Sequence, residues 1–295
     1  MMKFILDRLE QGEVLVADGA MGTMLLEKGV QPGECPASVN LKNPEVLEEI
    51  ARLYLHAGAD IIQTNTFGAS PMVLSDYGLV DETEEINQRA VFYVREVVGD
   101  RVYIAGSCGP SGRILKPYGE AEPDTLYRGY VRQMRALLSA GVDIMCIETM
   151  VDLKEATLAI KAAKSVSPQI PVIATMTFDE TPRGFFTVMG VGIEAAAAGL
   201  QEARADIIGS NCGNGISNMV KIAREFKRAT TLPVIIKSNA GLPETKGDTL
   251  TYPESPEFFA EKTQELIDAG VSIIGGCCGT TPEHIRAVKK VVDSR

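Results

Sequence analysis

Three cysteines stand at positions where their thiols could act together on a metal ion. Cys277 and Cys278 are adjacent within "SIIGGCCGTTPEHI", and Cys212 ends an earlier apolar run, "DIIGSNC". Thiolates favour zinc, and a catalytic zinc keeps three protein ligands and leaves a fourth position open. Three such cysteines without a fourth therefore fit an open, catalytic type of zinc site better than a closed structural one.

Other interpretations of the cysteine pair remain open at the level of the residues. Two small neighbouring side chains can simply pack together in a core, as free cysteines often do. A disulfide between adjacent residues is strained, and a reducing compartment opposes it. The remaining cysteines, Cys35, Cys108 and Cys146, are scattered, and Cys146 within "VDIMCIETM" is predicted to be a small core residue.

Strand-like and helix-like segments alternate along the whole chain. Amphipathic stretches such as "PEVLEEIARLYLHAG" predict helices, and several end in a glycine tag, "HAGAD", "SAGVD" or "DAGVS", with "EARAD" as a glycine-free version. Glycine at that place can adopt the left-handed conformation that ends a helix. Short runs of apolar and β-branched residues predict eight strands, at residues 13–19, 60–66, 101–107, 143–149, 171–177, 206–212, 233–239 and 272–278.

Eight strand-and-helix units in a chain of this length predict a single (β/α)8 TIM barrel that spans residues 1–295. The strands are almost wholly apolar, as expected when both faces are covered. The alternative is a doubly wound open sheet, but "ADGAMGT" after the first strand lacks the spacing of a dinucleotide fingerprint. The longest irregular segments, 24–43, 107–123 and 178–192, each follow a strand, where a barrel carries its functional loops.

The carboxyl ends of barrel strands meet at one mouth, so residues there are predicted to lie together. The sixth and eighth strands bring Cys212 to Cys277 and Cys278, which favours the metal interpretation. Asp18 and Glu148 end the first and fourth strands and are predicted to bind a ligand, as an acid and base pair or by holding an ammonium group, although such carboxylates also cap loops. The two histidines, at positions 56 and 284, are not at strand ends, so we discount both as ligands.

The composition excludes several classes of protein. A net charge of −10, a pI near 4.9 and the lack of any run of Lys or Arg argue against nucleic-acid binding. Charges interrupt every apolar run near the N-terminus, and no window approaches the length of a membrane span. Six cysteines are too few for a disulfide scaffold. We expect a cytoplasmic protein with a small ligand.

Five motifs resemble those of the homocysteine S-methyltransferase family. Within that family they are most similar to the homocysteine-binding barrel of cobalamin-dependent methionine synthases. These motifs are "GGCCGTTPEHI", "NCGNG", "LVADGAMGTMLLEKG", "ADIIQTNTFGAS" and "SNAGLP", and the resemblance covers essentially the whole chain. It implies a TIM barrel in which Cys212, Cys277 and Cys278 bind Zn²⁺, and the open position captures the thiol of homocysteine.

The resemblance also implies roles for further residues at the mouth. Asp18, with Gly19, and Glu148 would hold the substrate ammonium, and backbone amides around Gly19 and Thr66 would take its carboxylate. Asn239, in the "NAG" motif, would occupy the zinc until the substrate arrives. The product of methyl transfer would be methionine.

The methyl donor is the least determined part of the resemblance. The family uses methylcobalamin on a partner domain, betaine, or S-methylated sulfonium compounds such as S-methylmethionine or S-adenosylmethionine. The betaine branch is expected to carry a Tyr beside the substrate-binding Glu, where this chain has Thr149, and the chain has no Trp for an aromatic cage. We therefore expect a methylcorrinoid from a partner protein or domain. A non-catalytic barrel that only holds homocysteine or zinc remains an alternative.

Overall fold

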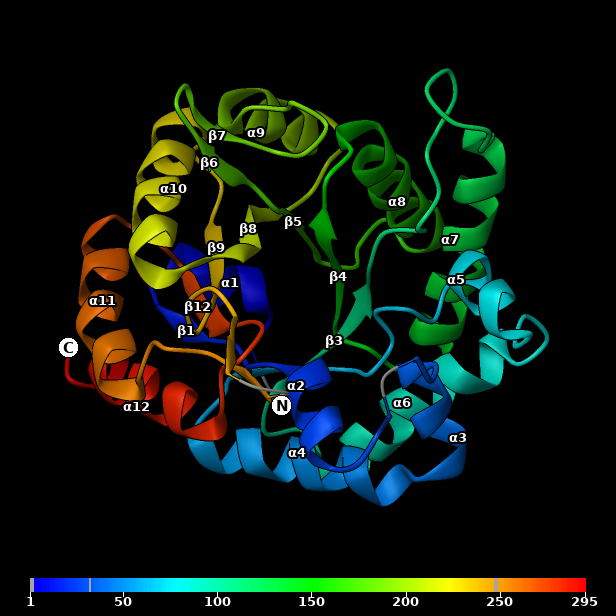
Figure 1. Ribbon diagram of the computed structural model, residues 1–295, viewed down its shortest axis with the longest axis horizontal. Helices are drawn as coiled ribbons and strands as arrows, with labels where there is room; N and C mark the ends of the chain where they lie inside the picture. Colours follow the sequence, from blue (N-terminus) through cyan, green and yellow to red (C-terminus); the bar gives the residue numbers. More distant parts are fainter. Residues whose placement is uncertain (1–2, 32, 247–248) are drawn as a thin grey trace.

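The computed structural model describes residues 3–31, 33–246 and 249–295, and a sheet of eight parallel strands forms its centre (Figure 1). The order along the sheet is β1-β12-β9-β8-β5-β4-β3-β2, and a parallel bridge between Ala17 and Ile61 joins β1 to β2. The sheet therefore closes, and the predicted TIM barrel is confirmed. All eight predicted strands are present: β1 Leu15–Val16, β2 Ile61–Gln63, β3 Tyr103–Cys108, β4 Ile144–Met150, β5 Val172–Met176, β8 Ile207–Gly215, β9 Val234–Asn239 and β12 Ile273–Gly276.

An outer ring of helices covers the barrel, and the signals that begin and end them are local. Pro256 and Pro282 occupy first-turn positions, and Ser255 caps α11 by accepting a hydrogen bond from Phe258 N. Among the described residues, no helix has both the length and the apolar character needed to cross a membrane. The ring consists of α4 Pro44–Ala57, α6 Thr83–Val98, α7 Pro123–Ser139, α8 Leu153–Val166, α9 Ile193–Glu202, α10 Ile216–Ala229, α11 Pro256–Asp268 and α12 Pro282–Asp293.

The tags between helix and strand adopt the predicted left-handed conformation. Gly58, Gly141 and Gly270 have φ angles of 93°, 91° and 85°. In the glycine-free tag "EARAD", Arg204 takes the equivalent place with φ 76°. The joint between helix and strand is therefore the same in all four repeats, and in one of them a residue with a side chain bears the strain.

Apolar side chains fill the interior of the barrel toward the amino-terminal ends of the strands. Inward-facing residues such as Ile144, Ile207 and Cys146 form a buried cluster, which confirms Cys146 as a core residue. Helix α1 (Ile5–Glu10) covers the amino-terminal end, where Ile5 and Leu9 join this cluster. Full burial of each such aliphatic side chain contributes about 1.5–3 kcal/mol. One end of the barrel is thus sealed by apolar contacts, and polar chemistry is left to the other end.

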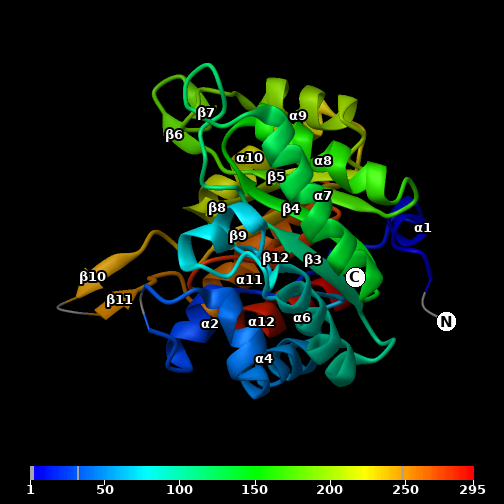
Figure 2. The same ribbon diagram turned by 90° about the vertical axis from the view of Figure 1, so that its right-hand side faces the viewer.

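The connections at the carboxyl ends of the strands contain more regular structure than predicted. Segment 24–43 includes short helices, and 178–192 holds the hairpin of β6 and β7. A second hairpin, β10 with β11, follows β9 and was not predicted. Figure 2 shows both hairpins on the side opposite α1. The minor elements are α2 Met21–Glu27, η1 Pro36–Ser38, α3 Val39–Lys42, α5 Pro71–Leu74, η2 Ser75–Tyr77, β6 Asp179–Thr181, β7 Gly184–Phe186, β10 Glu244–Lys246 and β11 Thr249–Thr251.

Candidate active site

The three cysteines predicted to act together meet at the mouth of the barrel. Cys212 lies in β8, and Cys277 and Cys278 directly follow β12. Their sulfur atoms all lie within 4.8 Å of one another, and the Cys212 and Cys278 sulfurs are 3.8 Å apart. A tetrahedral metal ion with metal–sulfur bonds of about 2.3 Å would place its sulfur ligands about 3.8 Å apart. The triad therefore fits a zinc ion, while the ligand role of each residue stays a prediction.

The backbone around the triad is shaped to bring these sulfurs together. Cys212 has φ 61°, a conformation that residues with side chains rarely adopt and that costs about 1–3 kcal/mol. Gly279, after the pair, has φ 77°. At Gly276, before the pair, an added Cβ would lie 2.2 Å from Thr280 Oγ1. The glycines on the two sides of the pair thus serve different needs, a left-handed turn after it and a close approach before it.

The triad on its own concentrates negative charge on one sulfur. Hydrogen bonds from Cys277 and then from Cys278 lower the pKa of Cys212 to about 3. Hydrogen bonding to Cys212 raises the pKa of Cys278 to about 11 and raises that of Cys277 well above its usual value. Cys212 is therefore the thiolate, and Cys277 and Cys278 stay protonated and donate to it. A bound cation is needed to hold all three sulfurs as thiolates.

Each sulfur also has a polar neighbour from a different strand or loop. Asn211 Nδ2 donates to Cys277 Sγ at 3.7 Å, Asn239 lies near Cys212, and Tyr252 lies near Cys278. Burial, followed by the nearby cysteines, raises the pKa of Tyr252 to about 12, so its hydroxyl remains a donor. The buried Asn239 Oδ1 has no hydrogen-bond partner among the described residues. An acceptor without a donor beside three sulfurs fits the predicted role of Asn239 as a labile metal ligand.

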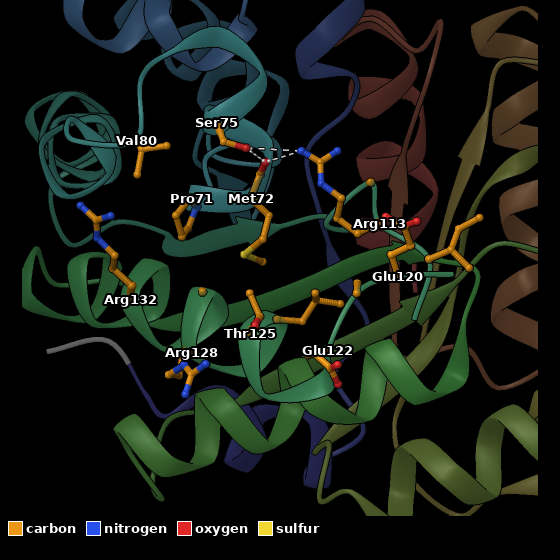
Figure 3. A pocket seen from close by; sticks show the side chains of 15 residues that line it. Pro71, Met72, Ser75, Val80, Arg113, Glu120, Glu122, Thr125, Arg128 and Arg132 are labelled. Atoms are coloured by element: carbon orange, nitrogen blue, oxygen red, sulfur yellow. Dashed lines mark hydrogen bonds between the residues drawn. The ribbon is translucent and has the colours of Figure 1, made fainter. Parts of the chain in front are cut away.

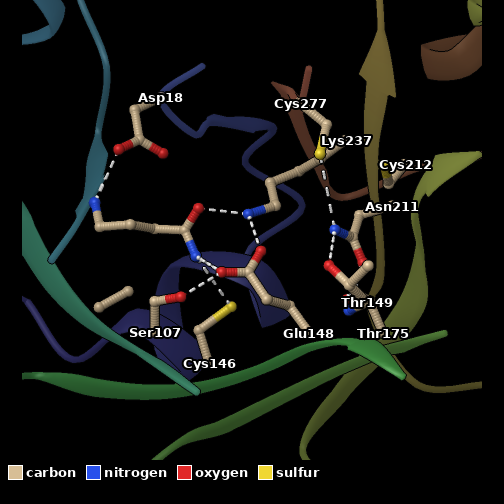
Figure 4. Close-up of polar contacts among 12 residues, drawn as sticks. Asp18, Ser107, Cys146, Glu148, Thr149, Thr175, Asn211, Cys212, Lys237 and Cys277 are labelled. Carbon is tan, nitrogen blue, oxygen red and sulfur yellow. Dashed lines mark hydrogen bonds and ion pairs between the residues drawn. The ribbon is translucent and has the colours of Figure 1, made fainter. Parts of the chain in front are cut away.

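A charged network lies next to the triad (Figure 4). Lys237 on β9 and Glu148 on β4 are 2% and 6% exposed, and Lys237 Nζ lies 2.6 Å from Glu148 Oε2. Burial is the largest single influence and lowers the pKa of the Lys237 ammonium, but Glu148 and the other acidic groups nearby together outweigh it and raise that pKa, so the lysine stays charged. Glu148 Oε1 accepts hydrogen bonds from Gln63 Nε2 at 2.7 Å and from the Ser107 hydroxyl. The carboxylate of Glu148 is thereby held in one orientation.

Asp18 differs from Glu148 because it lacks a full set of partners. Its Oδ2 accepts from Gln63 N at 2.7 Å, whereas the buried Oδ1 has no partner among the described residues. Burial raises the pKa of Asp18 to about 7, even though Lys237 nearby lowers it. Leaving a buried acceptor unpaired costs about 1–3 kcal/mol. The free oxygen of Asp18 is therefore a ready acceptor for a ligand's cationic donor.

The two backbone positions predicted to receive a carboxylate are not equivalent. Within the described part of the chain, Gly19 N has no hydrogen-bond partner, and an added Cβ at Gly19 would lie 2.8 Å from both Thr280 Oγ1 and Tyr54 Oη. The Thr66 amide already donates to Thr64 O at 2.9 Å, and the Thr66 hydroxyl donates to Ser107 O at 2.7 Å. Gly19 thus offers a free amide to a ligand, whereas the amide and hydroxyl of Thr66 are already hydrogen-bonded within the protein.

Comparison with known proteins places these features in a family. A model of the family described as homocysteine S-methyltransferase matches residues 15–292. The chain belongs to this family. It is 34% identical to the methionine synthases of Mycobacterium leprae (strain TN) and Mycobacterium tuberculosis (strain ATCC 25618 / H37Rv), in each case over 98% of the chain. The match covers 25% of each relative, so the chain spans about a quarter of their length.

Solved structures of similar fold include a homocysteine methyltransferase. The homocysteine methyltransferase MmuM from Escherichia coli has a TM-score of 0.80 to this chain in both its metallated and its oxidised form. The sequence identities are 22% and 23%, and the matches cover 98% of this chain and 99% of MmuM. At that identity the likeness establishes the fold alone, and the fold is the barrel described above.

Reasoning from the sequence missed several residues of this candidate site. Lys237, Gln63, Asn211 and Tyr252 were not assigned roles. A signal existed for Lys237, because a charged residue inside the apolar run "PVIIKSN" can be buried only with a partner. The discounting of His284 fits the structure, where its Nδ1 belongs to the cap of α12 and its Nε2 lies 2.9 Å from Glu254 O.

A separate cavity of about 850 Å³ lies outside this site, between the segment of α5 and η2 and helix α7 (Figure 3). Met72 and Leu126 form apolar parts of its wall, and Arg113, Arg128 and Arg132 lie around it. Arg113 and Arg132 are already paired with Asp76 and Glu84. None of the residues that line this cavity is among the predicted site residues, so it contributes nothing to the metal centre.

Proposed function

We propose that this member of the homocysteine S-methyltransferase family is a zinc-dependent enzyme that methylates the thiol of homocysteine to give methionine. The observation that carries the proposal is the triad of Cys212, Cys277 and Cys278, whose sulfurs converge within 4.8 Å at the mouth that also holds the unpaired carboxylate oxygen of Asp18. A thiol-binding metal and a cation acceptor at one mouth match the two ends of an amino acid that carries a thiol.

The charged network matches the amino group of this substrate. Lys237 compensates Glu148, so the three groups Asp18, Glu148 and Lys237 carry one net negative charge when Asp18 is ionised. One ammonium group neutralises that charge. In the proposal Asp18 Oδ1 and Glu148 face the ammonium, and the substrate carboxylate lies toward Gly19 N and the backbone around Thr66.

The metal end of the site supplies the nucleophile. Zn²⁺ held by three thiolates would keep the substrate thiol deprotonated at neutral pH. Asn239 would release the fourth position when the substrate arrives, because its Oδ1 has no other partner among the described residues. In the overall reaction a sulfur–methyl bond forms, the bond between the methyl group and its donor breaks, and the thiol proton leaves to solvent.

A protein-borne methylcorrinoid is the proposed donor, and the surface around the mouth supports it. Most large apolar side chains that are exposed within the described residues belong to loops after the strands, whereas Phe4 and Phe92 lie elsewhere. We take the side chains in these loops as the contacts for a partner protein or domain, which an apolar surface at the mouth would suit. The exposed side chains in these loops are Leu26, Phe67, Tyr77, Ile114, Tyr118, Val188, Met189 and Leu242.

The proposal is tested by measuring metal content and homocysteine methylation together. Wild-type protein should contain about one zinc per chain and should form methionine from methylcobalamin, whether free or protein-bound. Cys212→Ala should lose both zinc and turnover. Activity with S-methylmethionine, S-adenosylmethionine or betaine but none with methylcobalamin would overturn the donor. Zinc and homocysteine binding without turnover on any donor would identify a silent binding barrel.

A further inference from the structure

The side-chain amide of Asn211 uses its full hydrogen-bonding capacity at the barrel mouth. Asn211 is fully buried, and its Oδ1 accepts from Thr149 N at 2.8 Å and from the Thr175 hydroxyl at 2.6 Å. Its Nδ2 donates to Thr149 Oγ1 at 2.8 Å and to Cys277 Sγ at 3.7 Å. Because the backbone N–H of Thr149 can only donate, the atom that faces it must be Oδ1, and the positions of the Asn211 oxygen and nitrogen are therefore fixed.

These contacts join strands that carry different parts of the site (Figure 4). Thr149 on β4 follows Glu148 of the charged network, Thr175 lies on β5, and Cys277 follows β12. Asn211 itself precedes Cys212 on β8. One buried amide therefore touches the substrate side and the metal side of the mouth at the same time.

The same amide holds a strained backbone in place. Thr149 has φ 61°, and a β-branched residue in that conformation is a clear outlier. Such a residue costs about 1–3 kcal/mol and persists only where its surroundings determine it. Both polar groups of Thr149 that face Asn211, the backbone N–H and the hydroxyl, are bonded to it. Loss of the amide would leave Thr149 free to relax and would move Glu148 beside it.

At the sulfur, the amide supplies a neutral donor. An N–H that points at a thiolate stabilises the ionised form and fixes the direction of the sulfur lone pairs. A cationic donor would instead cancel part of the negative charge that three thiolates bring to the centre. Asn211 thus orients Cys277 without changing the net charge of the triad.

We propose that Asn211 is a positioning residue that sets the metal affinity of the triad through Cys277 and fixes the substrate wall through Thr149. This inference rests on the proposed function, because it takes Cys277 as a zinc ligand. Asn211 contacts neither the substrate nor the reacting atoms, and it acts through its two neighbours.

The test compares Asn211→Ala with Asn87→Ala in the full chain. Asn87 is a matched control for metal binding, since its buried amide also donates twice, to Ala69 O at 2.9 Å and Thr83 O at 2.7 Å, and neither acceptor belongs to the metal triad. Chelator competition gives the Zn²⁺ dissociation constant, and the thiolate-to-cobalt absorption of Co²⁺-loaded protein reports the sulfur environment. We expect Asn211→Ala to bind Zn²⁺ about 10- to 100-fold more weakly than wild type, with a shifted cobalt spectrum. Asn87→Ala should match wild type in both.

A second variant keeps the test decisive if Asn211→Ala does not fold. Asn211→Asp retains an acceptor for Thr149 N and Thr175 but cannot donate to Cys277, so it should also lose Zn²⁺ affinity and shift the cobalt spectrum. Zn²⁺ affinity and spectrum equal to those of Asn87→Ala in either folded Asn211 variant would overturn the inference alone. Wild-type protein that binds no Zn²⁺, or Cys277→Ala that binds it normally, would instead overturn the proposed function.

Discussion

At the residue scale, the mouth combines two kinds of chemistry that are usually kept apart. The sulfurs of Cys212, Cys277 and Cys278 form a soft metal site, and Asp18 with the pair of Glu148 and Lys237 forms a buried charged site. Each is incomplete without a ligand: the triad needs a cation to ionise fully, and Asp18 keeps one oxygen unpaired. An amino acid with a thiol would complete both at once.

The raised pKa of Asp18 predicts how amino-acid binding depends on pH. Since that pKa is about 7 in the free protein, Asp18 loses its charge as the pH falls from 8 to 6, and an ammonium group then binds less tightly. The dissociation constant of methionine, which has no free thiol to titrate, should therefore rise through this range. Calorimetry at several pH values measures it. Asp18→Asn should bind weakly at every pH, and a wild-type constant that stays flat would contradict the role of Asp18.

The ion pair of Lys237 and Glu148 predicts a double-variant result. Lys237→Met leaves a buried carboxylate without its counter-charge, and the free energy of unfolding should fall by about 3–5 kcal/mol. Adding Glu148→Gln removes the stranded charge and should restore most of that stability. Urea unfolding gives both values. The double variant should still bind homocysteine poorly, because Glu148 is proposed to face the substrate ammonium. Normal homocysteine binding by the double variant would contradict that role of Glu148.

At the element scale, the strands were predictable because each is an apolar run whose boundaries carry turn residues. The cysteine triad followed from strand order alone, since the ends of β8 and β12 lie on either side of β9 in the closed sheet. The two hairpins were not predictable, because each of their strands is only three residues long, and β6, "DET", is polar and largely exposed. The sequence does not predict the network around Lys237. Inward-facing side chains on different strands meet only if they lie at the same height along the barrel axis, and the sequence does not give that height.

The repeated tags between helix and strand predict that two substitutions change the free energy of unfolding in opposite directions. Arg204 occupies a left-handed position that glycine takes in the other three tags, so Arg204→Gly should raise the free energy of unfolding by about 0.5–1 kcal/mol. Gly141→Ala makes the opposite change at φ 91°, with no atom within 4 Å of the added Cβ, and should lower it by about 1 kcal/mol. Thermal unfolding compares them, and equal signs would contradict the shared geometry.

At the scale of the whole molecule, the barrel separates stability from chemistry. Apolar contacts with α1 close the amino-terminal end, and the polar groups gather at the opposite end among the long connections. The family match and the likeness to MmuM extend over nearly the whole chain, whereas the methionine synthases named above continue well beyond it. A donor carried by another protein or domain would therefore approach the rim of the mouth.

That approach predicts a difference between donors. Tyr118 and Val188 are 84% and 72% exposed on two loops of the rim. The double substitution Tyr118→Ser and Val188→Ser should lower kcat/KM with a protein-bound methylcorrinoid by about tenfold, the effect of losing about 1.4 kcal/mol of contact. Turnover with free methylcobalamin should fall much less. Steady-state kinetics with the two donors measure the ratio, and equal losses would argue against docking at these loops.

We propose that three cysteines hold a zinc ion whose fourth position receives the substrate sulfur. X-ray absorption at the zinc edge, recorded on the intact protein before and after homocysteine is added, tests it most directly. We expect three sulfur ligands and one oxygen or nitrogen ligand before addition, and four sulfur ligands afterwards. A coordination shell that contains fewer than three sulfurs, or one that homocysteine leaves unchanged, would contradict it.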